Sequence, residues 1–262
     1  MTAPQPPVGV SADTGRYLYA VCRGLDAAAV DSVQGIDGAT LELVDHRDLV
    51  ALVSTVPLSS YGEEALRRNL EDLSWLETVV RAHDTVIHAA ARHAPTAPLR
   101  LATVCFDDAA VRDRLREWYV ALTDVLDRVD GCSEWSVKVL VPTEAPEPSE
   151  TAAPTSGADY LRRKKSDAAR RAGTAEAATA TAHLVHDSLA SHARDSRQLP
   201  PQDPRLSGHE GTMVLNAAYL VPDDAAEAFA GLVAGLGAEH PDVVVDGRGP
   251  WPPYSFAMLE QR

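Results

Sequence analysis

The sequence predicts an α+β protein made of two domains. Two observations carry this prediction. β-prone runs and helical periodicities alternate through the first half of the chain, so strands and helices follow one another closely. A stretch rich in proline and glutamate then interrupts this pattern before a second, shorter series of elements begins. We therefore divide the chain into a disordered leader, a first domain, a linker and a second domain, at residues 1–15, 16–141, 142–156 and 157–262.

The composition is that of a globular protein with an acidic balance. Of the 262 residues, 45% are hydrophobic and 24% are charged, and the formal net charge is −14. This charge argues against nucleic acid or an anionic membrane as the main partner. No run of about 18 apolar residues predicts a membrane span. Residues 1–15 lack the basic and apolar regions of a signal peptide, so we expect a cytoplasmic protein.

The three cysteines, Cys22, Cys105 and Cys132, are far apart in the sequence, and each lies in or beside an apolar run. Their odd number and wide spacing argue against a disulfide framework or a metal site. We expect small buried thiols in a reducing cytoplasm.

The first domain opens with three predicted strands. Arg16–Cys22 is rich in β-prone residues. Thr40–Val44 and Asp48–Val56 follow, and the short polar turn between them predicts a β-hairpin. From Glu63 to about His93, apolar residues recur at steps of three and four, which predicts one long helix or two consecutive helices with one apolar face. The residues of this face are Leu66, Leu70, Leu73, Leu76, Val80, His83, Ile87 and Ala90.

Two more strands and a helix complete the first domain. Leu99–Phe106 is the next β-prone run, and a helix capped by Asp107 or Asp108 extends to about Arg128. In Glu134–Val141 every second residue is apolar, which predicts a last strand. The resulting order is close to the ferredoxin-like βαββαβ arrangement, with an extra helix between its halves.

The second domain begins with a long, alanine-rich helix. Its first residues, Ser156–Asp159, resemble a capping box, and the helix extends to about Ser196. Thr212–Val221 predicts a strand, Asp223–Leu236 a helix and Val243–Val245 a short strand. The second domain is therefore a smaller α+β unit with a long leading helix.

The most distinctive stretch lies near the C-terminus and consists of Gly249, Pro250, Trp251, Pro252, Pro253, Tyr254, Ser255 and Phe256. Its prolines exclude a helix and predict an extended, polyproline-like arm that becomes a strand at about Tyr254. We expect the aromatic side chains to hold this arm, either as a staple that closes the protein's own core or as a ridge that faces a partner. We favour the staple, with Trp251 as its buried anchor, because Tyr254–Met258 alternates like a strand that joins a sheet.

No motif for catalysis or cofactor binding is found in the sequence. It contains no Walker A loop, no nucleophile elbow, no His-Glu-x-x-His and no Cys-x-x-Cys. Gly231, Gly235 and Gly237 imitate a glycine-rich loop, but they lie within or at the end of a helical pattern, where capping and close packing explain them better. We therefore predict no catalytic residues, no cofactor and no enzymatic activity.

Histidine is the residue type that would suggest a metal site. His83, His88 and His93 are spaced by five residues, which spreads them around a helix. His83 falls on the apolar face, so we expect it to be a core histidine. His183 and His186 are one turn apart, but two ligands on a surface helix make a weak site. We predict no metal site.

One cluster of positive charge stands out in this acidic sequence. It consists of Arg162, Arg163, Lys164, Lys165, Arg170 and Arg171. The cluster is either a solvated helix face paired with acids of the same chain, or a docking surface for an acidic partner. For a docking surface, changing its first four residues to glutamate should weaken partner binding and leave the melting temperature unchanged.

The stretch Gly-Pro-Trp-Pro-Pro-Tyr-Ser-Phe resembles the signature of the gas vesicle accessory proteins of the GvpL/GvpF family. Five other segments resemble that family in the same order along the chain. They are Tyr17–Val21, which is similar to its first strand; Trp75–His83 with Val86, its long helix; Pro98–Val104, its Pro-Leu-Arg-Phe-Gly-Thr-Val strand; Glu134–Val139, its Glu-Trp-x-Val-Lys strand; and Ser156–Leu161, its Ser-Gly-x-x-Tyr-Leu helix start.

The resemblance implies an N-terminal ferredoxin-like domain, a C-terminal α+β domain and a protein associated with gas vesicles. It implies a non-enzymatic role in gas vesicle assembly, through contact with the small apolar shell protein and with other accessory proteins. On this view the glutamate substitutions in the basic cluster should weaken binding of the shell protein. It leaves open whether the chain is the F-type or the L-type member. The alternative is a small-molecule-sensing ferredoxin-like module or a cryptic hydrolase, and the identity of the neighbouring genes would separate the two.

Overall fold

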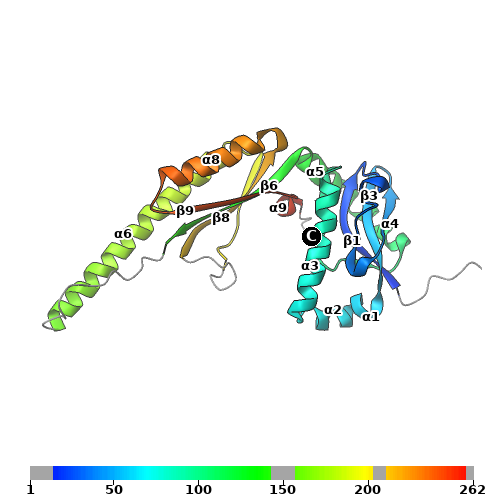
Figure 1. Ribbon diagram of the computed structural model, residues 1–262, viewed down its shortest axis with the longest axis horizontal. Helices are drawn as coiled ribbons and strands as arrows, with labels where there is room; N and C mark the ends of the chain where they lie inside the picture. Colours follow the sequence, from blue (N-terminus) through cyan, green and yellow to red (C-terminus); the bar gives the residue numbers. More distant parts are fainter. Residues whose placement is uncertain (1–13, 143–156, 203–210, 258–262) are drawn as a thin grey trace, which may run out of the picture. The chain divides into compact units, whose positions relative to one another are not determined.

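The computed structural model describes residues 14–142, 157–202 and 211–257 (Figure 1). The chain forms two compact units, which we describe separately. Unit 1 comprises residues 1–131 and 252–262, and unit 2 comprises residues 132–251. Unit 2 is therefore inserted into unit 1: the chain leaves unit 1 after Gly131 and returns to it at Pro252.

Unit 1 contains an antiparallel sheet with the strand order β2-β3-β1-β4, and a short strand, β5, also pairs with β1. The bounds are Thr14–Arg23 for β1, Leu41–His46 for β2, Leu49–Pro57 for β3, Thr96–Pro98 for β4 and Val104–Cys105 for β5. The central strand β1 is apolar and aromatic, and it is buried over most of its length. The predicted hairpin is present, and Arg47 in its turn has a φ of 58°.

The helices of unit 1 pack on this sheet and surround a core that contains the rings of Tyr17, Tyr19 and Tyr61. Asp72 and Asp107 cap the helices that follow them by accepting hydrogen bonds from backbone N–H groups. The α-helices are α1 (Leu58–Tyr61), α2 (Glu63–Asn69), α3 (Leu73–Ala91), α4 (Asp108–Glu117), α5 (Tyr119–Val129) and α9 (Tyr254–Ala257), and two 3-10 turns, η1 (Ala27–Ala29) and η2 (Ile36–Gly38), link β1 to β2.

Unit 2 contains a second antiparallel sheet with the order β7-β8-β6-β9. Its elements are β6 (Cys132–Val141), α6 (Gly157–Ala190), β7 (Asp195–Gln198), β8 (Thr212–Pro222), η3 (Asp223–Ala225), α8 (Ala226–Glu239) and β9 (Val244–Trp251). Alternate residues of β6 and β8 share one core with apolar residues of α6 and α8, so both helices cover the same face of the sheet.

The strand predicted as the last of the first domain is present, but it belongs to the other sheet. Glu134–Val141 is a strand, β6, but it pairs with β8 and β9 in unit 2 instead of completing the first sheet. The link between β1 and β2 holds only two 3-10 turns, where the ferredoxin-like arrangement has a helix. The structure thus has mixed helix and strand with two antiparallel sheets, and the ferredoxin-like description is not confirmed.

Several predicted boundaries also differ. Of the two alternatives from Glu63, the structure has two consecutive helices, α2 and α3. The strand predicted at Leu99–Phe106 is reduced to β5, because β4 ends at Pro98 and Ala102 between the two strands has a φ of 62°. The arm predicted as extended is strand β9 as far as Trp251, with a cis bond before Pro250, and the strand predicted at Tyr254 is the one-turn helix α9. Pro142 apart, the predicted linker lies outside the described residues.

Because unit 2 is inserted into unit 1, cleavage of the predicted linker should leave the two fragments held together. A protease site introduced between residues 143 and 156 would separate β6 from β8 and β9, although β6 pairs with both along most of its length. We expect the cut chain to migrate as one particle in native buffer and as two fragments in denaturant, because these ladders bury apolar residues on both strands. Size-exclusion chromatography before and after denaturation measures this. Separation of the fragments in native buffer would contradict the pairing of β6.

Candidate interaction surfaces

His83 is a buried core histidine with both ring nitrogens hydrogen-bonded, as predicted. Its side chain is 4% exposed. Nε2 lies 3.3 Å from the Leu99 carbonyl oxygen, which can only accept, so Nε2 carries the proton. Nδ1, 3.1 Å from the Tyr17 hydroxyl, then accepts from that group. Burial lowers the pKa of His83 to about 4, so this residue is neutral and structural near neutral pH.

The tyrosines around His83 have the same structural role. The Tyr17 hydroxyl accepts from the Ala102 backbone N–H at 2.9 Å, and the Tyr19 hydroxyl accepts from the Ile36 N–H at 2.8 Å. Tyr61 donates to Asp37 at 3.1 Å. Burial raises the pKa of all three phenols above their ordinary value. Their hydroxyl groups therefore fix the loops at the sheet edge and are not poised for proton transfer.

The other predicted candidates for metal binding are dispersed. His88 lies 3.4 Å from Asp84, and His93 is exposed. On α6, the Nδ1 of His186 lies 2.8 Å from the Tyr219 hydroxyl, while His183 is exposed. Within the three described ranges, no group of three histidine, cysteine or acidic side chains is placed to hold a metal ion.

None of the three cysteines forms a disulfide bond. Cys22 and Cys105 are buried, and Cys132 is half-buried. Burial raises the pKa of Cys22 to about 11 and also raises that of Cys105. A thiol that stays protonated is a poor nucleophile, so these two cysteines behave as small core residues.

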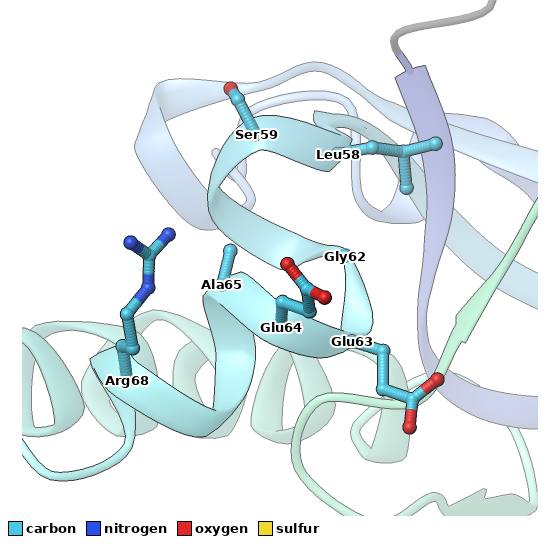
Figure 2. Close-up of a pocket in the computed structure, with 7 residues that line it drawn as sticks. All are labelled: Leu58, Ser59, Gly62, Glu63, Glu64, Ala65 and Arg68. Atoms are coloured by element: carbon cyan, nitrogen blue, oxygen red, sulfur yellow. The ribbon is translucent and has the colours of Figure 1, made fainter.

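A shallow pocket of about 380 Å³ lies at the junction of α1 and α2. Figure 2 shows the side chains of Ser59, Glu64 and Arg68 around it, with Leu58 on one side. Most of its lining side chains are exposed, and Glu63 forms an ion pair with Arg67 on the next turn. Ligand pockets are enclosed and largely apolar. This pocket therefore gives no support to a small-molecule site.

An apolar surface lies at the corner where α2 leads into α3. Leu70, Leu73 and Val80 are 41%, 79% and 44% exposed, and Leu76 between them is half-buried. Leu73, Leu76 and Val80 follow steps of three and four and so share one side of α3. We call these four residues the α3 shoulder. The buried side of α3 consists of Val79, His83, Val86, Ile87, Ala89 and Ala90.

The basic cluster lies on a part of α6 that has no buried side chain among those described. The stripe of α6 that packs on the sheet begins at Ala178 and continues through Ala182, Val185 and Leu189. Before it, Leu161, Arg162, Lys164 and Lys165 and the residues from Gly173 to Ala177 are exposed. The side chains of Arg163, Arg170 and Arg171 lie outside the described set. We call residues 157–177 the basic half of α6.

The proline-rich stretch divides between the two units. In unit 2, Gly249 sits against Trp135: a Cβ at this position would lie 2.7 Å from the Trp135 ring, so only glycine fits. In unit 1, Pro252, Pro253 and Phe256 are buried. Trp251 is 44% exposed. The staple interpretation therefore holds for Phe256, whereas Trp251 is not the buried anchor that the sequence suggested.

Two glycines of α8 differ from their interpretation in the sequence. Gly231 and Gly235 lie inside the helix and not at its end, and a Cβ at either would meet no atom within 4 Å. Neither capping nor close packing in this chain requires them, although each costs about 1 kcal/mol relative to alanine. Gly237 is different, since a Cβ there would make an ordinary contact of 3.6 Å with Val245.

α6 has 34 residues, yet no helix in the described parts is apolar enough over a sufficient length to cross a membrane.

Comparison with known proteins gives consistent results. The chain is 42% identical to gas vesicle protein L of a Streptomyces species over 257 residues, with 96% of each chain covered. It is 26% identical to gas vesicle protein F2 of Halobacterium salinarum, with 93% of this chain and 92% of that protein covered.

The fold agrees with solved structures of the same kind. The crystal structure of gas vesicle protein GvpF from an Anabaena species matches with a TM-score of 0.69 at 19% identity, covering 95% of this chain and 98% of that one. GvpF from Microcystis aeruginosa matches with a TM-score of 0.65 at 17% identity, covering 94% and 99%. The family model described as gas vesicle synthesis protein GvpL/GvpF matches residues 15–258. The chain therefore belongs to the GvpL/GvpF family of gas vesicle synthesis proteins.

Proposed function

We propose that this protein is a non-enzymatic accessory factor of gas vesicle formation, which binds the small apolar shell protein and other gas vesicle proteins. The observation that carries the proposal is the family match over residues 15–258. The surfaces of the described residues support it: they offer an apolar shoulder and a charged, projecting helix, and the pocket at α1 and α2 is shallow and open. These features suit protein–protein contact.

The α3 shoulder is the surface that fits an apolar shell protein. Leucine and valine side chains exposed to water gain free energy when a partner covers them, at roughly 25 cal/mol per Å² of apolar surface. Clustered exposed apolar residues on a monomer mark interaction sites. Capping by Asp72 fixes the first turn of α3, so Leu73 is presented on a rigid helix and binding would require little ordering of the surface.

The basic half of α6 fits a different partner. Its charge would attract an acidic surface and set the register and rate of association, and it would do little for an apolar protein. The shell protein and an acidic protein can thus be bound by different units of the same chain.

Replacing Leu73 and Val80 by serine is expected to weaken binding of the shell protein at least tenfold, since loss of two apolar contacts of this kind exceeds about 1.4 kcal/mol. Both residues are exposed, so stability should change by no more than about 0.5 kcal/mol. The measurement is co-purification with co-expressed shell protein, together with gas vesicle formation in cells that lack the native gene.

Val120→Ser is the matched control, because Val120 is apolar and 72% exposed but lies on α5, away from the α3 shoulder in the sequence. It should bind the shell protein like the wild type. Unchanged binding by the Leu73→Ser, Val80→Ser variant would remove the shoulder from the proposal, and normal gas vesicle formation in cells lacking this gene would argue against the function itself.

A further inference from the structure

No side chain described in the basic half of α6 is buried. Its 21 residues extend about 31 Å at a rise of 1.5 Å per residue, and Figure 1 shows α6 continuing well past the sheet of unit 2. The packed half of α6, which begins at Ala178, forms the helix nucleus, so residues 157–177 extend it without a second nucleation step. The exposed side chains described on this half are available to another molecule.

The charge of this half is opposite to that of the remaining chain. Residues 157–177 contain six arginine or lysine residues against Asp159, Asp167 and Glu176, a net charge of +3. Because the whole chain carries −14, the other residues together carry −17. A second copy of this protein is thus itself a strongly acidic partner.

The face of α8 that points away from the sheet is complementary in both shape and charge. Its exposed residues are Ala228, Gly231, Ala234, Gly235 and Ala238, none of which has a side chain larger than a methyl group. Space is open above both glycines, so another helix could approach the backbone closely. Exposed acids stand on both sides of this face: Asp223, Asp224 and Glu227 before it, and Glu239 and Asp242 after it.

We propose that the basic half of α6 in one copy packs across the exposed face of α8 in a second copy. Both surfaces are exposed within the chain, so they do not cover one another in the same molecule. Leu161, 66% exposed, would lie on the Gly/Ala face, while the exposed Lys164 and Lys165 would meet the flanking acids. The inference rests on the proposed function in that it names the acidic partner of this helix.

The contact joins two different surfaces, so it is heterologous. Heterologous contacts generate rings when the rotation closes and open filaments when it does not. Because charge contributes to this contact, association should weaken as salt rises from about 0.05 M to about 0.5 M and the Debye length falls to a few ångströms. Light scattering or sedimentation of the full chain should show particles larger than a monomer at low salt.

Charge reversal on either surface tests the pairing. Lys164→Glu with Lys165→Glu, and separately Glu227→Lys with Glu239→Lys, should each give monomers at low salt. Mixing the two variants should restore association, because the unchanged α6 of the α8 variant then meets the unchanged α8 face of the α6 variant. Arg92→Glu with Arg112→Glu in unit 1 is the charge-matched control and should leave association unchanged.

A steric variant tests the α8 face without changing charge. Gly231→Leu with Gly235→Leu adds side chains where a Cβ meets nothing in the chain, and leucine favours a helix over glycine. This variant should melt no lower than the wild type and should be monomeric. Monomeric wild-type protein at low salt, association that survives the α6 reversal, or reversed variants that fail to associate when mixed would each overturn the inference.

The same variants separate this inference from the proposed function. If self-association is absent while the α6 reversal still abolishes gas vesicle formation, the helix binds another protein and only the second-copy assignment fails. If the chain self-associates as described but cells lacking it form normal gas vesicles, the inference stands and the proposed function fails.

Discussion

Replacing Phe256 by alanine is expected to lower the free energy of unfolding of unit 1 by about 3–5 kcal/mol. The side chain is fully buried in the one-turn helix α9, which packs against α5 and β4. Pro253 and Ala257 beside it are buried as well, so the surrounding residues have little freedom to close the cavity. Urea unfolding followed by circular dichroism measures the loss, and hydrogen exchange in β1 and β3 assigns it to unit 1.

Trp251→Ala in the same stretch is the control. Trp251 is larger than phenylalanine but 44% exposed, so its removal should cost about 1 kcal/mol. The sequence alone favoured Trp251 as the buried anchor, and the two variants decide between these assignments. A loss from Trp251→Ala that equals or exceeds the loss from Phe256→Ala would show that the packing of α9 is not what holds the end of the chain.

Sequence patterns predicted most helices and strands of this protein, because their formation depends on residues that are close together in the sequence. The hairpin of β2 and β3, the cap at Asp107 and the strand character of β6 all follow from residues within a few positions of one another. The sheet that a strand joins cannot be inferred from such nearby residues. The alternation of Trp135, Val137 and Val139 requires a buried face, and either sheet could provide one. Pairing with β8 and β9 depends on contacts 71 to 117 residues away in the sequence.

The exposure of the α3 shoulder could not be predicted from the sequence either, because it also depends on long-range packing. Leu70, Leu73 and Val80 continue the steps of three and four that include His83 and Ile87, and the sequence assigned them all to one face. The break between α2 and α3 interrupts that face, and the side of α3 with Leu73 and Val80 is adjacent to the buried side instead of being part of it. Periodicity identifies an apolar side of a helix, but burial also depends on how far the neighbouring elements extend.

The basic cluster on α6 was visible in the sequence, whereas the surface proposed to receive it was not. Gly231 and Gly235 suggested capping or close packing, since most helical glycines have such a reason. The open space above both residues shows that neither capping nor close packing within this chain explains them.

Unit 1 is expected to lose stability as the pH falls from about 6.5 to about 4, and His83 is the cause. Its pKa is about 4 in the folded protein, against an ordinary value of 6.5. Between these values the unfolded chain binds a proton that the folded protein does not, so acidification favours unfolding. The stabilising effect of a neutral His83 is complete above pH 6.5. A difference of this size corresponds to about 3 kcal/mol by pH 4.

The hydrogen bonds of His83 explain why the proton is excluded. Nδ1 accepts from Tyr17, and the Tyr17 oxygen already accepts from the Ala102 N–H. A proton on Nδ1 would face the Tyr17 hydroxyl hydrogen, so the hydroxyl would have to rotate and give up its hydrogen bond to Nδ1. The charge would also lie in an apolar surrounding among Tyr17, Tyr19 and Val86.

His83→Gln removes the titrating group while keeping a side chain that can both donate and accept. Its free energy of unfolding is expected to be lower than that of the wild type at pH 7.5, but nearly constant down to about pH 5, where the wild type declines by up to about 1.4 kcal/mol per pH unit. His93→Gln, at an exposed position just after the end of α3, should keep the wild-type slope. Urea unfolding at half-unit pH steps gives the three curves. Parallel curves for the wild type and His83→Gln would mean that the buried histidine does not set the acid sensitivity of unit 1.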